Sequence, residues 1–130
     1  KVVSDVNADN TEGDQDHKAL QYHFQKGMAL PPKLAFLQPL SDRLKAVPGE
    51  RYVEYSMCLR QDLVPTHFRD WDNAWVRGAA DYVIVDGEQA TYLDWKKGKF
   101  RENDDQIELT ALLLFRHFPQ LKKVKGGLVF

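Results

Sequence analysis

The stretch WVRGAADYVIVDGEQATYLDWK, Trp75–Lys96, contains two apolar runs separated by the turn-forming pair Asp86-Gly87. Runs rich in valine, isoleucine and tyrosine on either side of an Asp-Gly pair are typical of a β-hairpin. The second run nevertheless ends in Asp94 and Lys96, two charged residues in a segment that is otherwise apolar. The stretch therefore predicts a hairpin that places ionised groups in a buried strand.

The length of the hairpin loop decides how these charges are arranged. If the Asp-Gly pair alone forms the turn, Asp94 lies diagonally across from Asp81, whereas a four-residue loop places the two carboxylates directly opposite each other. Both even loops put them on one face, roughly 5 Å apart when opposed and 7–8 Å when diagonal. Lys96 joins the face of Asp94 because side chains alternate along a strand. A three-residue loop would separate the charges.

The apolar spacing of the remaining chain predicts five further elements. Helices are expected at about Asp14–Lys26, Lys33–Ala46 and Glu102–Phe118, and strands at Arg51–Leu59 and Lys122–Phe130. Pro39 is expected to kink or split the second helix, because proline lacks the amide hydrogen that a helix interior needs. The order of elements predicts an α/β or α+β fold with a small central mixed β-sheet flanked by helices.

Composition limits the class of protein. The chain has 130 residues, of which 43% are hydrophobic, so it can bury one core. We expect a single domain over 14–130 behind a flexible polar tail at 1–13. No apolar run approaches the ~18 residues of a membrane span, and a lone cysteine, Cys58, excludes an internal disulfide. The net charge of -1 means that any contact with DNA must be local.

Two close carboxylates repel each other, and burying them is costly unless a cation compensates. Their oxygen donors favour Mg²⁺ or Mn²⁺, and Lys96 is placed to hold a water molecule or to neutralise charge on a phosphoryl group. The alternative is a structural salt-bridge cluster of Asp81, Asp94 and Lys96 at a sheet edge. Likewise, the small residues Gly78 and Ala79 either let a substrate approach the strand or pack against a neighbouring element.

The segment RGAADYVIVDGEQATYLDWKKGK…DDQIELTALLLF resembles the PD-(D/E)XK nuclease superfamily, in particular its RecB-like exonuclease branch. The resemblance rests on Asp81, on the D-x-K motif Asp94-Trp95-Lys96 and on Gln106 early in the following helix. Upstream, GDQDHKALQYHFQKG is similar to the branch's first helix, with His17 at the position of its histidine. The resemblance implies a restriction-endonuclease-like fold and a single nuclease domain over 14–130.

The resemblance also implies a metal-dependent hydrolysis of phosphodiester bonds in DNA, supported by Mg²⁺ or Mn²⁺. The metal ligands would be His17, Asp81, Asp94 and the carbonyl of Trp95, and the catalytic residues Asp81, Asp94, Lys96 and Gln106. Lys96 would orient the attacking water. Gln106 would touch the scissile phosphate or brace Lys96, or else it completes a capping box with Asn103.

The implied partner is DNA, as single strands or duplex ends, in recombination, repair or phage replication. The expected setting is the cytoplasm of a bacterial or phage-infected cell, and an oligomer is possible. Candidate DNA-binding residues are Lys97, Lys99, Arg101 and Arg77. Exposed aromatic residues among Phe68, Trp71 and Trp75 would stack on unpaired bases, although we expect at least one of the tryptophans to lie in the core.

One position departs from the family pattern. Gln21 stands where the branch has a glutamate, and a neutral amide is a weaker ligand for a hard cation. This favours an alternative in which the domain keeps the nuclease fold but has lost cleavage and binds DNA or a protein partner. The presence of Asp81, Asp94 and Lys96 favours an active nuclease.

Overall fold

The computed structural model describes residues 15–95 and 106–129, and the side chains of the second range from Glu108 onward. The described chain divides into two compact units, Lys1–Val47 and Pro48–Phe130. We call them the N-terminal unit and the C-terminal unit.

The N-terminal unit is helical, as predicted. A helix covers residues 15–26 and ends at Gly27, whose φ of 76° favours glycine. The second predicted helix is split, as expected, into a 3-10 helix η1, Pro32–Leu37, and an α-helix α2, Gln38–Ala46. The break falls just before Pro39, which occupies the first turn of α2, where its missing N–H removes no intrahelical hydrogen bond.

A buried histidine links the two α-helices of this unit. His23 Nδ1 lies 2.6 Å from the carbonyl oxygen of Met28, and Nε2 lies 2.7 Å from Ser41 Oγ. Because a carbonyl only accepts hydrogen bonds, Nδ1 carries the proton and Nε2 accepts from the serine hydroxyl. His23 and Ser41 are both buried, and every polar atom named here has a partner, so the pair stabilises the unit.

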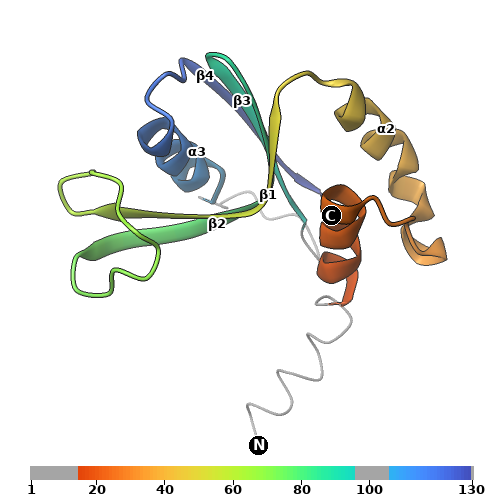
Figure 1. Ribbon diagram of the computed structural model, residues 1–130, viewed down its shortest axis with the longest axis horizontal. Helices are drawn as coiled ribbons and strands as arrows, with labels where there is room; N and C mark the ends of the chain where they lie inside the picture. Colours follow the sequence, from red (N-terminus) through yellow and green to blue (C-terminus); the bar gives the residue numbers. More distant parts are fainter. Residues whose placement is uncertain (1–14, 96–105, 130) are drawn as a thin grey trace, which may run out of the picture. The chain divides into compact units, whose positions relative to one another are not determined.

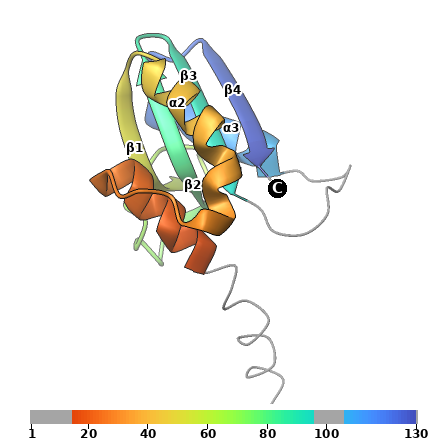
Figure 2. The ribbon, with the colours of Figure 1, turned by 90° about the vertical axis from the view of Figure 1, so that its right-hand side faces the viewer.

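The C-terminal unit contains a four-stranded sheet in which the strands lie side by side in the order β1-β2-β3-β4, as Figure 2 shows. The strands are β1 Glu50–Arg60, β2 Ala74–Asp86, β3 Gln89–Trp95 and β4 Lys123–Val129. The first three are antiparallel in succession, and β4 runs parallel to β3. The return from β3 to β4 passes through α3, Gln106–His117. The predicted α+β fold with a mixed sheet is confirmed.

Helix α3 packs on one face of this sheet (Figure 1, Figure 2). Leu113 and Leu114 are fully buried in the core that the helix forms with Met57, Val83 and Tyr92. None of the described helices has the length and apolar character that crossing a membrane requires.

Close packing of α3 also explains a glycine in β2. A Cβ atom added to Gly78 would lie 2.7 Å from Leu113 Cδ1, so the glycine lets helix and sheet approach each other. Of the two roles considered for Gly78, the structure supports packing.

Candidate active site

The β2–β3 hairpin places Asp81 and Asp94 at the same level of the sheet. Val85 pairs with Ala90 and Tyr82 with Leu93, which is the register that sets Asp81 directly opposite Asp94. Asp86 also pairs with Gln89. Only two residues are left between these partners, so the loop has two residues and not four. The turn is therefore Gly87-Glu88, one residue later than the Asp86-Gly87 turn considered from the sequence, and it gives the opposed register of the four-residue alternative.

Both aspartate carboxylates accept backbone hydrogen bonds from the opposite strand where the regular β2–β3 pairing ends. The backbone N–H of Asp81 donates to Asp94 Oδ1 at 3.0 Å, and the backbone N–H of Trp95 donates to Asp81 Oδ2 at 2.7 Å. Beyond Tyr82 and Leu93, side-chain carboxylates thus replace carbonyl oxygens as acceptors between the strands. These two hydrogen bonds fix both carboxylates in position, and charged acceptors make such bonds stronger than neutral ones.

A residue of β1 produces the irregularity that surrounds Asp81. Pairing between β1 and β2 runs up to Val53 with Tyr82, skips Glu54 and Asp81, and resumes at Tyr55 with Ala80. Glu54 has a φ of 55°, in the left-handed region that non-glycine residues rarely occupy.

The same irregularity reverses the alternation of side chains. Tyr52 and Tyr55 lie on either side of Glu54, yet both contact the ring of Phe118 at 5.5 Å between centroids. In β2, Ala80 and Val83 both belong to the core, although an odd spacing would send them to opposite faces. Asp81 lies at this reversal, outside the regular ladder on both of its sides.

Burial distinguishes Asp94 from the other aspartate of the site. Its relative exposure is 2%, whereas Asp81 is half-buried. A carboxylate that deep in the protein is unfavourable unless hydrogen bonds and a cation compensate for lost hydration. The site therefore combines a fixed, desolvated carboxylate with a second one that solvent reaches.

The donor set suits a hard divalent cation. Two carboxylates from adjacent strands are the oxygen ligands that Mg²⁺ and Mn²⁺ prefer, and Mg²⁺ commonly keeps several waters beside one or two carboxylates. Among residues 15–95 and 108–129, no three His, Cys, Asp or Glu side chains form a metal-binding group. His17, the third predicted ligand, belongs to the N-terminal unit.

Several predicted site residues lie outside the described part of the chain. These are Lys96, Lys97, Lys99 and Arg101, and also Asn103 of the proposed capping box. Gln106 is the first described residue of α3, but its side chain is not among those described. The roles assigned to these residues stay predictions.

Arg77, the described member of the predicted DNA-binding set, is engaged within the protein. Its Nε donates to the carbonyl oxygen of Phe68 at 2.7 Å, and its guanidinium carbon lies 3.5 Å from the centroid of the Trp71 ring. The arginine thus holds the β1–β2 connection. A direct contact of Arg77 with DNA stays a prediction.

The expectation that a tryptophan of this segment lies in the core is wrong. Trp71 is 71% exposed and Trp75 is 55% exposed. Aromatic content alone cannot distinguish a core position from a surface one, because the preference for burial is statistical.

The left-handed backbone conformation of Glu54 was not predicted from the sequence. The signal was present in the segment RYVEYSM, where Tyr52 and Tyr55 are three residues apart and strict alternation cannot bury both. An odd spacing of large aromatic residues within a strand indicates a local reversal of the faces.

No family model, curated protein or solved structure matches the chain.

Proposed function

We propose that the C-terminal unit carries the active centre of a metal-dependent DNA nuclease, most simply an exonuclease, of the PD-(D/E)XK type. The observation that supports this most directly is the opposed pair Asp81 and Asp94, whose carboxylates are fixed by hydrogen bonds from the backbone N–H groups of Trp95 and Asp81. The restriction-endonuclease-like arrangement is part of this proposal. It is supported by the order of three antiparallel strands, a helix and a parallel strand.

In this proposal each residue has a distinct task. Asp94 and Asp81 hold the cation, with the carbonyl of Trp95 as a further ligand. The bound Mg²⁺ or Mn²⁺ would lower the pKa of a coordinated water and offset charge on the phosphate. Lys96, two residues after Asp94, orients the attacking water and stabilises the pentavalent transition state. Gln106 contacts the phosphate or braces the lysine.

The burial of Asp94 supports a cation site at this position. Its carboxylate is 2% exposed and accepts the backbone N–H of Asp81. A desolvated carboxylate attracts a cation more strongly than an exposed one, because the local dielectric constant is lower.

The test is cleavage of end-labelled single-stranded and duplex DNA with Mg²⁺, with Mn²⁺ and with EDTA. We expect metal-dependent products that disappear in Lys96→Ala and in Asp94→Asn, while Asp86→Asn, an exposed aspartate of the same hairpin, cleaves like the wild-type protein. The product ladder gives the polarity. If no condition produces more cleavage than Lys96→Ala does, the cleavage-deficient binding module replaces the nuclease.

A further inference from the structure

The outer part of the β1–β2 hairpin forms an arm that projects from the sheet (Figure 1). It consists of Arg60, residues 74–77 and the connecting loop 61–73. In this part, β2 pairs with β1 alone, because its pairing with β3 includes no residue before Tyr82. The arm carries both exposed tryptophans, Trp71 and Trp75.

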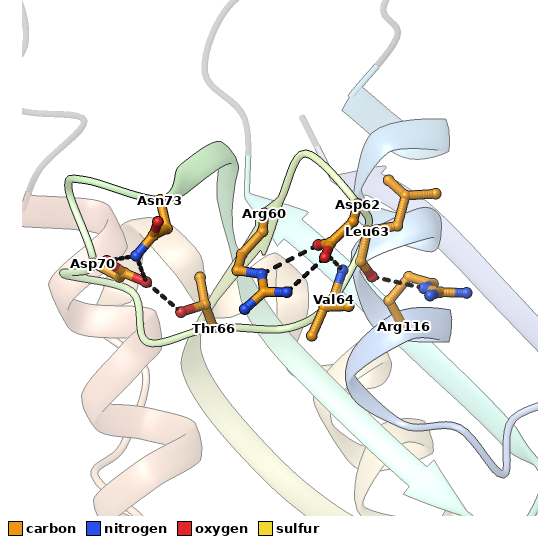
Figure 3. Close-up of polar contacts among 8 residues, drawn as sticks. All are labelled: Arg60, Asp62, Leu63, Val64, Thr66, Asp70, Asn73 and Arg116. Atoms are coloured by element: carbon orange, nitrogen blue, oxygen red, sulfur yellow. Dashed lines mark hydrogen bonds and ion pairs between the residues drawn. The ribbon is translucent and has the colours of Figure 1, made fainter.

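Polar contacts hold the connecting loop in a defined conformation (Figure 3). Arg60 forms an ion pair with Asp62, whose Oδ1 also accepts from the N–H of Val64. The carbonyl oxygen of Leu63 accepts from Arg116 Nε of α3 at 2.9 Å. The near half of the loop is thereby tied to both strand and helix.

The far half of the loop has its own network (Figure 3). Asp70 accepts from the hydroxyl of Thr66 at 2.6 Å and from the amide of Asn73 at 3.1 Å. The Thr66 hydroxyl lowers the pKa of the Asp70 carboxyl, and Asn73 adds to the effect, so the network is in its charged form at neutral pH. The loop that presents Trp71 is therefore pre-organised.

Arg77 supports the ring of Trp71 from within the arm. Its guanidinium lies over that ring at 3.5 Å and over the ring of Phe68 at 5.8 Å, while its Nε donates to the Phe68 carbonyl. The indole is thus fixed against a cation on one face and remains 71% exposed overall. A large ring held in place and open to solvent has a π-face available for stacking at little entropic cost.

The surroundings of the rings favour a nucleic acid over an apolar protein surface. Arg69, Asp72 and Asn73, the exposed neighbours of the two tryptophans in the sequence, are all polar or charged. Nucleobases present a π-face with hydrated edges, and aromatic side chains stack on them without regard to sequence.

We propose that Trp71 and Trp75 form a stacking platform for the unpaired bases of a single-stranded nucleic acid. The choice of a nucleic acid as ligand rests on the proposed function. It restricts the substrate of that function to single strands, because a stacking platform binds unpaired bases and not duplex. Positive and negative residues are interspersed on the arm, so stacking supplies most of the affinity and Arg69 adds a salt-sensitive contact with phosphate.

The experiment measures the Kd of a fluorescent oligo(dT) in EDTA, so that binding is separated from cleavage. We expect Trp71→Ala to weaken binding by about 5-fold to 100-fold, since one base–aromatic stack is lost, and Trp75→Ala to act in the same direction. Trp71→Phe, which retains a π-face, stays within about 3-fold of the wild-type protein. Phe36→Ala removes an equally exposed ring of the N-terminal unit (67%) and leaves the Kd unchanged.

Duplex of the same length provides the second comparison, and Trp71→Ala should leave its Kd unchanged. The platform is refuted if both tryptophan variants bind oligo(dT) like the wild-type protein, or if single strand and duplex lose affinity equally. Absence of binding by the wild-type protein also refutes it and leaves a protein partner for the rings. If Trp71→Ala cleaves DNA and binds oligo(dT) with the wild-type Kd, the stacking platform is refuted and the nuclease proposal stands. If the wild-type protein binds oligo(dT) through the tryptophans but cleaves no DNA, the nuclease proposal is refuted and the platform stands.

Discussion

The candidate site depends on the conformation of a few individual residues. Glu54 adopts a left-handed φ of 55°, and the ladder between β1 and β2 omits Glu54 and Asp81. On the side of Asp81 that faces β3, the backbone N–H of Asp81 donates to a side-chain oxygen, Asp94 Oδ1. Strain of this kind persists only where the surroundings enforce it, and it is common at functional sites.

The backbone of Glu54 gives the first prediction. In an ordinary strand, alanine is more stable than glycine, but a left-handed conformation costs an L-residue roughly 1–2 kcal/mol that glycine avoids. We expect Glu54→Gly to be more stable than Glu54→Ala by about 1 kcal/mol in urea denaturation. Ser56, an exposed residue of the same strand, is the control, where the glycine variant should be the less stable. The same order at both positions would contradict the assigned backbone conformation.

At the scale of elements, the sequence predicts the positions of the helices and strands well and the register of strand pairing less well. Periodicity locates β2 and β3, because apolar runs on both sides of Asp86-Gly87 are unambiguous. The register stayed open between two possibilities, since Asp86, Gly87 and Glu88 all suit a turn. Local sequence could not show that Trp71 and Trp75 are exposed, because that depends on how the connecting loop packs.

The pairing of β3 with β4 gives the second prediction. Gly126 lies opposite Tyr92, and a Cβ atom added there would collide with the fully buried Tyr92 ring. The neighbouring Gly127 has room, because its nearest contact would be Leu93 Cδ2 at 3.5 Å. We expect Gly126→Ala to lower the free energy of unfolding by about 1–3 kcal/mol and Gly127→Ala to change it little. Equal effects in thermal denaturation would contradict the described register.

At the scale of the whole molecule, charge restricts how the protein can bind a polyanion. The net charge is -1, so long-range attraction to DNA is weak and affinity must come from local contacts. In our proposals these contacts are the cation held by Asp81 and Asp94, the basic residues after Lys96 and the stacking platform.

Three tyrosines of the C-terminal unit give the third prediction, which concerns stability at high pH. The hydrogen bond to the Glu50 carboxylate raises the pKa of Tyr52, and burial raises the pKa of Tyr55 and of Tyr82, all above the ordinary 10.0. The folded protein therefore keeps protons that the unfolded chain releases. Their stabilising contribution is complete below pH ~10 and is lost as pH rises through the folded-state pKa values.

We expect the free energy of unfolding to fall as pH rises above ~10, and to fall less steeply in Tyr55→Phe. Denaturation in urea at a series of pH values measures both slopes. A variant slope equal to that of the wild-type protein would show that Tyr55 releases its proton equally in both states.

The central claim is that Asp81 and Asp94 bind a divalent cation, and thermal unfolding tests it most directly. Mn²⁺ at ~100 times its Kd should stabilise the wild-type protein by about 2.7 kcal/mol. Asp94→Asn keeps an oxygen for the N–H of Asp81 but removes the charge that binds a cation. With Mn²⁺, the Tm of the wild-type protein and of Asp86→Asn should rise, and that of Asp94→Asn should not. An equal response of all three proteins to Mn²⁺, or none, would contradict the claim.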